Sequence, residues 1–105
     1  MEDKISKIET EVVGVLRNIY DPEIPVNVFD LGLIYEIDVD NEYMVKVTMT
    51  LTAPNCPMAD DIVNEVKIKV AQIADVKGSD VNLVFEPPWD KSMMSEEAML
   101  ELGLL

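Results

Sequence analysis

The chain has 105 residues, with 21 Asp and Glu against 8 Lys and Arg, so its formal net charge is −13. Such an acidic chain repels phosphates, which makes DNA and RNA poor partners. It contains no histidine and one cysteine, Cys56, which excludes Ser-His and Cys-His couples and a disulfide within one chain.

Length and hydropathy predict one globular domain over residues 1–105, because 49% of the residues are apolar. No apolar run approaches the roughly 20 residues that a membrane helix needs, and the residues after Met1 do not resemble a secretion signal. Together with a lone free thiol, these features predict a cytoplasmic protein without a membrane partner.

Residues 4–19 place apolar side chains at helical spacing and charged ones on the opposite side, which predicts an amphipathic helix. Pro22 and Pro25 disfavour helix at the residues before them, so this helix is expected to stop near Tyr20. An irregular connection is then expected to run to about Leu33.

Apolar and polar residues alternate over residues 35–39 and 43–52, which predicts an antiparallel hairpin with its turn at residues 40–42. Thr50 and Thr52 are expected on the polar face, at the end of the second strand. The residues of the first strand expected to face the core are Tyr35, Ile37 and Val39.

A second helix is expected to start near Pro57, a residue suited to the first helical position. A third strand is predicted over residues 81–86, parallel to the second strand because one helical crossover returns the chain to its starting side. Ser95 is a good N-cap for a last helix that stops at Gly103. The residues of the third strand expected to face inward are Val81, Leu83 and Phe85.

The predicted order of elements is therefore α-β-β-α-β-α. One apolar sheet face and two amphipathic helices predict a two-layer α/β (α+β) fold, with a small three-stranded mixed sheet and the helices packed on one face. The other face of the sheet is expected to stay polar unless the C-terminal segment or a partner covers it.

Cys56 is the first candidate for chemistry. It precedes a predicted helix, whose free N–H groups and dipole favour the reactive thiolate. Asp60 and Asp61 lie one turn later and raise the pKa of the thiol, so the net effect stays open. The alternative is that Cys56 is a small buried apolar residue at the start of a helix.

Three further candidates each have an ordinary structural explanation. Asp21 and Glu23 sit on a proline-stiffened loop that can bind a hard cation or steer a partner, or that simply ends a helix in a turn. Thr50 and Thr52 offer hydrogen bonds beside the cysteine, or reflect β-propensity. Trp89 follows two prolines and either anchors an interface or covers one end of the core.

Five motifs in this order resemble the PaaD/SufT family of iron-sulfur cluster assembly factors, also described as metal-sulfur cluster biosynthetic proteins. The motifs are Asp21-Pro22-Glu23-Ile24-Pro25, Asp30-Leu31-Gly32-Leu33-Ile34-Tyr35, Thr50-Leu51-Thr52-Ala53-Pro54-Asn55-Cys56-Pro57, Glu86-Pro87-Pro88-Trp89 and Met94-Ser95-Glu96-Glu97-Ala98. The similarity covers essentially the whole chain. It implies the fold of the iron-sulfur cluster assembly domains and a functional site at Asp21, Glu23, Thr50, Thr52 and Cys56.

The resemblance also implies a function, that of an accessory or carrier factor in iron-sulfur cluster assembly and in the maturation of iron-sulfur proteins, and not an enzyme. Clusters usually take about four protein ligands, so we expect Cys56 to be a transient ligand of iron or of a cluster shared with a partner, a second subunit or a small thiol. A homodimer that joins two Cys56 side chains is one such arrangement. The implied partners are a scaffold or ATPase carrier and client apo-proteins.

Three alternatives stay open at this point. The chain can be a docking adaptor that binds no cluster and acts through Trp89, the last helix and the acidic surface. It can be a PaaD-like accessory subunit of a multicomponent oxygenase, but such relatives typically carry an additional cysteine-rich segment, and this sequence has one cysteine. A thiol-dependent enzyme is disfavoured, because there is no histidine and the only arginine, Arg17, lies in the first helix.

Overall fold

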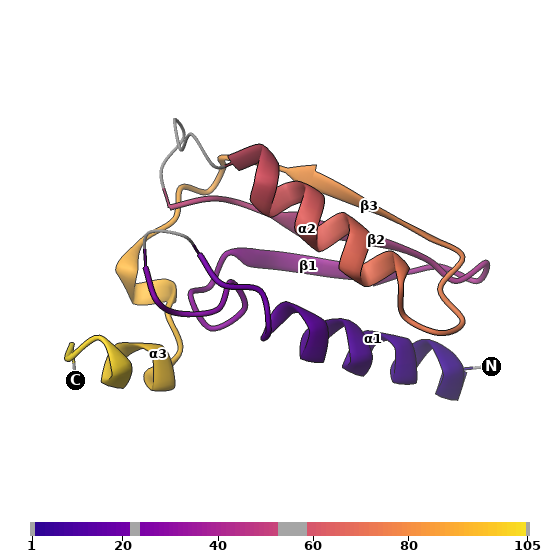
Figure 1. Ribbon diagram of the computed structural model, residues 1–105, viewed down its shortest axis with the longest axis horizontal. Helices are drawn as coiled ribbons and strands as arrows, with labels where there is room; N and C mark the ends of the chain where they lie inside the picture. Colours follow the sequence, from indigo (N-terminus) through magenta and orange to yellow (C-terminus); the bar gives the residue numbers. More distant parts are fainter. Residues whose placement is uncertain (1, 22–23, 53–58, 105) are drawn as a thin grey trace.

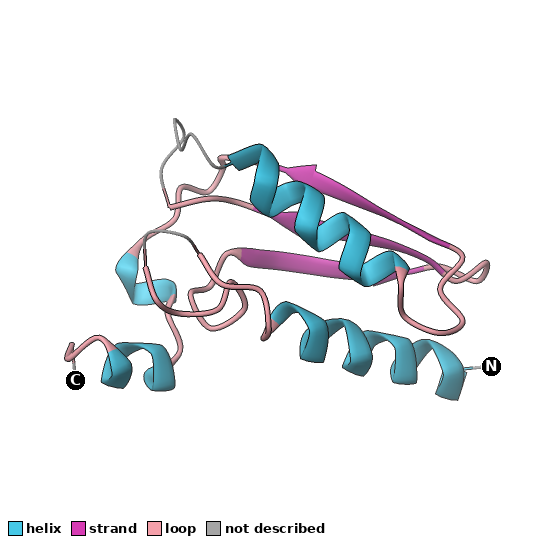
Figure 2. Ribbon diagram, viewed as in Figure 1, coloured by secondary structure: helices cyan, strands magenta, loops and turns pink. Residues whose placement is uncertain are grey.

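A computed structural model describes residues 2–21, 24–52 and 59–104, and Figures 1 and 2 show the arrangement of their elements. In chain order the elements are α1 (Glu2–Leu16), β1 (Ile34–Val39), β2 (Met44–Met49), α2 (Ala59–Ala71), β3 (Gly78–Leu83), the 3-10 helix η1 (Lys91–Met93) and α3 (Glu96–Glu101). This order confirms the predicted α-β-β-α-β-α sequence. No helix in the described part of the chain is long and apolar enough to cross a membrane.

The three strands form one mixed sheet in the order β1-β2-β3. β1 pairs with β2 in antiparallel orientation, and β2 pairs with β3 in parallel orientation. The parallel pair follows from the α2 crossover, which returns the chain to the end of the sheet where β2 began. The predicted hairpin and the predicted parallel third strand are both confirmed.

Helices α1 and α2 cover one face of the sheet (Figure 2). α1 packs against β1, α2 packs against β3, and the two helices contact each other. Burial of their apolar stripes against alternate residues of β2 forms the core and is the main favourable term in folding. The fully or nearly fully buried residues of this layer include Ile8, Val12, Leu16, Val45, Val47, Met49, Ile62, Val66 and Val70.

The opposite face of the sheet is polar, as expected. In the strand ladder Asp38 lies opposite Lys46, and Lys46 lies opposite Asp80, so a row of alternating charges crosses all three strands. These three side chains are exposed. Alternating charges on neighbouring strands stabilise such a face weakly, by roughly 0.2–1 kcal/mol per pair.

α1 ends at Leu16, earlier than the predicted end at residue 19. The backbone then tightens, because the N–H groups of Asn18 and Ile19 bond to the carbonyls three residues back, at Val15 and Leu16. The Ile19 carbonyl is thereby free to accept a hydrogen bond from the Val28 N–H, at 2.8 Å. The apolar periodicity continues into this turn, since Ile19 is buried, but the helix does not.

The prediction that Tyr35 faces the core is wrong. The register between β1 and β2 shifts between Ile34 and Glu36, so Tyr35 is an extra residue in the ladder. Ile34 packs against the core instead. The Tyr35 hydroxyl donates a hydrogen bond of 2.7 Å to the Pro87 carbonyl oxygen, which ties β1 to the C-terminal segment.

β3 begins and ends earlier than predicted, at Gly78 and Leu83, because its register is set by pairing with β2 and not by its own apolar residues. The predicted inward position of Phe85 is wrong, since that side chain is 41% exposed. β2 likewise ends at Met49, and Thr50 is buried instead of lying on the solvated polar face.

The last helix follows the prediction. The Ser95 side chain accepts a hydrogen bond from the Ala98 N–H and caps α3, and Gly103 after it has a φ of +74°. Ala98 is buried against the core, and the Ser95 N–H bonds to the Asp30 carbonyl at 2.8 Å. α3 therefore closes the end of the molecule and does not cover the polar sheet face (Figure 1).

Candidate functional site

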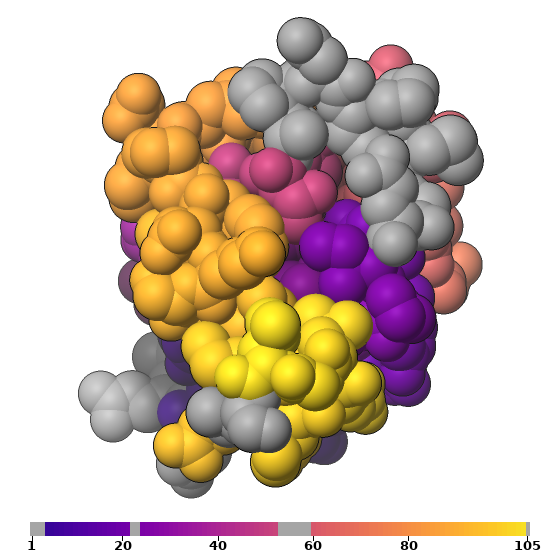
Figure 3. Space-filling view, turned by 90° about the vertical axis from the view of Figure 1, so that its left-hand side faces the viewer, coloured from indigo at the N-terminus to yellow at the C-terminus, as the bar shows by residue number. Residues whose placement is uncertain are grey.

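Three segments meet at one end of the sheet: the loop that follows α1, the end of β2 and the segment that follows β3 (Figures 1 and 3). Hydrogen bonds fix this junction. The Thr50 N–H bonds to the Leu33 carbonyl at 2.8 Å, and the Val84 N–H bonds to the Met49 carbonyl at 2.9 Å. The main chain after β2 is thus held between the other two segments.

A pocket of about 230 Å³ lies at this junction. We call it the end pocket, and it is lined by Thr50, Leu51, Thr52, Phe85, Pro88 and Trp89. The structure thereby brings together two sets of candidate residues that the sequence separates by more than thirty positions, the threonines after β2 and the tryptophan after β3. Figure 3 shows the surface of this end, where residues near position 50 lie between the orange segment that follows β3 and the purple loop that follows α1.

Thr50 is 1% exposed, and its hydroxyl oxygen has no hydrogen-bond partner among the described residues. A buried hydroxyl without a partner costs roughly 1–3 kcal/mol of stability. Such a cost is tolerated mainly where the group has another use, so Thr50 is a candidate for contact with a ligand or partner. Thr52, two residues further on, is partly buried.

Trp89 is partly buried and packs against the core, and it also lines the end pocket. Its indole N–H donates a hydrogen bond of 2.6 Å to the Leu31 carbonyl oxygen. The ring therefore covers one end of the core and at the same time forms a fixed wall that a partner can reach. The two interpretations of Trp89 that the sequence allowed are compatible in this position.

Asp21 is 6% exposed, at the start of the loop that follows α1. Its carboxylate Oδ1 accepts a hydrogen bond of 3.0 Å from the Ile24 N–H, and its own N–H donates to the Val26 carbonyl. The carboxylate thus stabilises the turn after the helix, and it is not among the residues that line the end pocket. The turn explanation of this motif accounts for these contacts.

Two candidates, Cys56 and Glu23, lie outside the described residues, as does the predicted helix start at Pro57. In the part of the chain that the structure describes, no group of three or more His, Cys, Asp or Glu side chains could hold a metal ion. Sequence patterns missed Leu51 and Pro88 as pocket residues, and they misplaced Phe85. The sequence signal that could have indicated Pro88 as a pocket residue was the pair of prolines, because proline restricts the path of the chain after β3.

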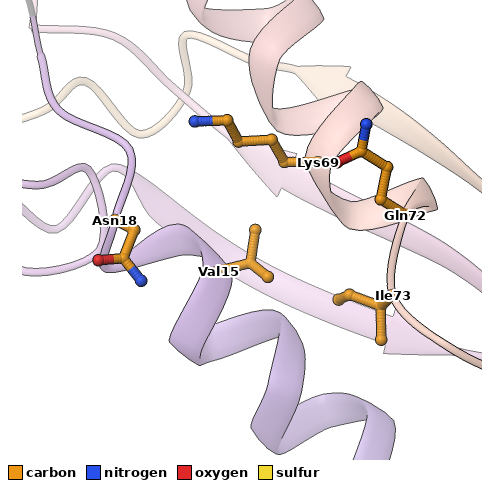
Figure 4. Close-up of a pocket in the computed structure, with 5 residues that line it drawn as sticks. All are labelled: Val15, Asn18, Lys69, Gln72 and Ile73. Atoms are coloured by element: carbon orange, nitrogen blue, oxygen red, sulfur yellow. The ribbon is translucent and has the colours of Figure 1, made fainter.

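A second hollow lies between α1 and α2 and is lined by Val15, Asn18, Lys69, Gln72 and Ile73 (Figure 4). Two of its polar side chains, Asn18 and Lys69, have local partners. Asn18 donates to the Gly14 carbonyl oxygen at 3.0 Å, and Lys69 pairs with Glu65 at 2.7 Å. These polar side chains belong to the ordinary surfaces of the two helices, and we assign no chemical function to this hollow.

The fold places the chain in a known class of small α+β proteins. A crystal structure of a domain of unknown function from Bacillus anthracis matches with a TM-score of 0.88 and 36% identity, over 95% of both chains. Residues 9–83 match the family described as "Iron-sulfur cluster assembly protein". The chain belongs to this family, which confirms the resemblance stated from its motifs.

Two relatives extend the comparison. A protein of Porphyromonas gingivalis named "Fe-S protein maturation auxiliary factor" is 58% identical over 105 residues, which is 100% of both chains. A protein of Staphylococcus aureus named "Fe-S protein maturation auxiliary factor SufT" is 42% identical over 86 residues, 82% of this chain and 98% of that protein. Both relatives are similar over nearly their full length.

Proposed function

We propose that this protein is an auxiliary factor in iron-sulfur cluster assembly that helps client proteins to mature and has no turnover of its own. The observation that carries the proposal is the identity of 58% from end to end with a protein named as such a factor. The alignment covers 100% of both chains, so the sequence similarity is not confined to the core residues. The acidic composition is consistent with protein partners rather than nucleic acids.

Loss of the gene tests this function. In cells without it, iron-sulfur enzymes should lose specific activity while the amounts of their polypeptides stay unchanged, and enzymes without clusters serve as controls. Unchanged activity of all iron-sulfur enzymes tested, under iron limitation as well as in rich medium, would contradict the proposal.

Cys56 is the residue proposed to act on the cluster or iron, as one transient ligand. It lies in the segment between Thr52 and α2, and Thr52 lines the end pocket. A single thiolate supplies one of the roughly four ligands that clusters usually take. The remaining ligands would come from a scaffold, ATPase carrier or client, or from a small thiol or a second subunit, and weak attachment makes transfer easy.

A docking adaptor that binds no cluster is the second candidate function. It is favoured by the end pocket, whose described walls are largely apolar and aromatic and include Phe85 and Trp89. Partly exposed aromatic side chains in a fixed position are typical of protein contact sites. In this case Trp89→Ala would impair maturation more than replacement of Cys56.

Anaerobic reconstitution with iron and sulfide separates the two candidates. We expect wild-type protein to show a visible charge-transfer band that Cys56→Ala lacks, with a native mass that includes a second subunit or a small thiol. Thr48→Ala is a matched control, because Thr48 lies on β2, does not line the end pocket and is replaced without removing the thiolate. A band of equal strength in Cys56→Ala would contradict the ligand role, and no band in any protein would favour the adaptor.

A further inference from the structure

The end of the molecule that holds the end pocket carries large exposed apolar side chains, and one of them, Phe85, lines the pocket. Tyr20 is 57% exposed, Phe85 41%, Leu100 62% and Leu104 51%, and all four belong to segments that form this end of the molecule. Proteins that act alone rarely leave many such side chains on one end, so this end of the molecule is a candidate contact site for another molecule.

We propose that the end pocket binds an extended, basic segment of a partner protein, with one bulky apolar side chain of that segment inside the pocket and a hydrogen bond from it to the Thr50 hydroxyl. This inference rests on the proposed function, because it assigns a type of partner to the same site. It concerns only described residues.

The pocket has the size and lining for one apolar side chain. Its volume of about 230 Å³ exceeds the ~150 Å³ at which a protein cavity can take up benzene. Pro88 and the hydrogen-bonded ring of Trp89 fix its walls, so little conformational freedom is lost when it is filled. A side chain of the size of Phe or Leu fits this description.

The Thr50 hydroxyl is a second, independent indication of a ligand. It is a buried donor and acceptor without a partner among the described residues, on a residue that lines the pocket. The hydroxyl oxygen itself is covered, so a main-chain amide N–H or carbonyl of a bound segment can supply the missing hydrogen bond once the Thr50 side chain turns toward the pocket. An apolar side chain alone cannot supply it, which is why we infer a peptide segment.

Charge selects a basic partner. Residues 84–104 contain five carboxylates and one lysine, Lys91. The hydrogen bonds that Ser92 donates to Asp90 lower the pKa of that carboxyl, so it is ionised at neutral pH. For this pocket a second copy of this chain is the poorer match, because it brings the same net charge of −13, whereas a basic segment is attracted.

The test is an NMR titration of ¹⁵N-labelled protein with three heptapeptides: one with Phe between Arg residues, one with Ala between Arg residues and one with Phe between Glu residues. Trp89 is the only tryptophan, so its indole N–H gives a single, unambiguous signal in the pocket. The basic Phe peptide should shift the Thr50, Leu51 and Trp89 signals in a saturable way. The other two should bind at least about tenfold more weakly.

Two pairs of variants locate the binding. Thr50→Val keeps the side-chain shape without the hydroxyl and should weaken binding about five- to tenfold, while Thr48→Val, on the exposed side of β2, should not. Phe85→Ala should weaken binding, while Met44→Ala, also 41% exposed but at the other end of β2, should not. Amide spectra of the free variants confirm that they are folded.

The inference would be overturned by no saturable shift with the basic Phe peptide, by equal binding of the Glu peptide, or by unchanged binding to Thr50→Val. Shifts of the same signals with protein concentration alone would show that a second copy occupies the pocket, and would overturn it too. If these occur while loss of the gene still impairs iron-sulfur enzymes, the inference fails and the proposed function stands.

Discussion

At the scale of single residues, Thr50 links stability to the proposed contact site. Its buried hydroxyl has no hydrogen-bond partner in the described structure, so replacing it by a methyl group removes an unsatisfied polar group without changing the shape of the side chain. We predict that Thr50→Val raises the free energy of unfolding by about 1 kcal/mol. Urea unfolding, followed by the fluorescence of Trp89, measures this change.

Thr48→Val is the control for that prediction, because Thr48 is partly exposed and lies earlier on β2. It should change the free energy of unfolding by less than about 0.5 kcal/mol. A Thr50→Val protein that is less stable than wild type by 1 kcal/mol or more would mean that the hydroxyl is satisfied in solution.

Asp90 gives a prediction about pH. Side-chain and backbone hydrogen bonds from Ser92 lower the pKa of the Asp90 carboxyl below its ordinary value of 3.8. Its contribution to stability is therefore complete above that ordinary value and is lost as the pH falls through the lowered pKa. An NMR titration of the Asp90 carboxyl carbon should show the low pKa in wild type and a value nearer 3.8 in Ser92→Ala; equal values in the two proteins would contradict the assignment.

At the scale of elements, the sequence pattern predicted the type and order of the helices and strands better than it predicted where each of them begins and ends. The helices and the hairpin follow from periodicity, and α3 follows from Ser95 and Gly103. The inward position of Tyr35 was wrong because a one-residue shift of register reverses the side-chain directions, and nothing local in the sequence marks it. β3 begins at Gly78 because pairing with β2 holds residues of low β-propensity in the sheet.

The candidate site was predicted only in part. Thr50, Thr52 and Trp89 were singled out by residue type and by the family resemblance, and the structure unites them in one pocket. Their contact could not be predicted, because it depends on the path of the chain after β3 and on the bond from Trp89 to Leu31, 58 positions away. Whether Cys56 and Glu23 join them remains a prediction, since both lie outside the described residues.

Substitution of Gly32 tests how closely the loop after α1 packs against the C-terminal segment, and substitution of Gly14 serves as the comparison. Gly32 has a φ of +83°, and a Cβ atom there would clash with the Met93 carbonyl oxygen, so Gly32→Ala must strain or displace η1. We predict a loss of about 2–3 kcal/mol in the free energy of unfolding. Gly14→Ala, in α1 with nothing within 4 Å, should gain about 0.5–1 kcal/mol.

The comparison of these two variants in the same urea series controls for the substitution itself. Equal effects of Gly32→Ala and Gly14→Ala would contradict the close approach of the loop and η1.

At the scale of the whole molecule, the net charge of −13 opposes folding through repulsion among surface carboxylates. Salt screens this repulsion, since the Debye length falls from about 30 Å at 0.01 M to about 8 Å at 0.15 M ionic strength. We therefore predict that the melting temperature rises when NaCl is increased over this range at pH 7. A constant or falling melting temperature would show that attractive ion pairs balance the repulsion.

We propose that this protein helps iron-sulfur proteins to mature and that it acts through Cys56. The most direct measurement is the cluster content of one iron-sulfur client, purified anaerobically from cells that lack the gene and carry either the wild-type protein or Cys56→Ser at equal abundance. We predict full occupancy with the wild-type protein and occupancy as low as in the empty strain with Cys56→Ser. Equal occupancy with both proteins would contradict the claim and leave docking as the mode of action.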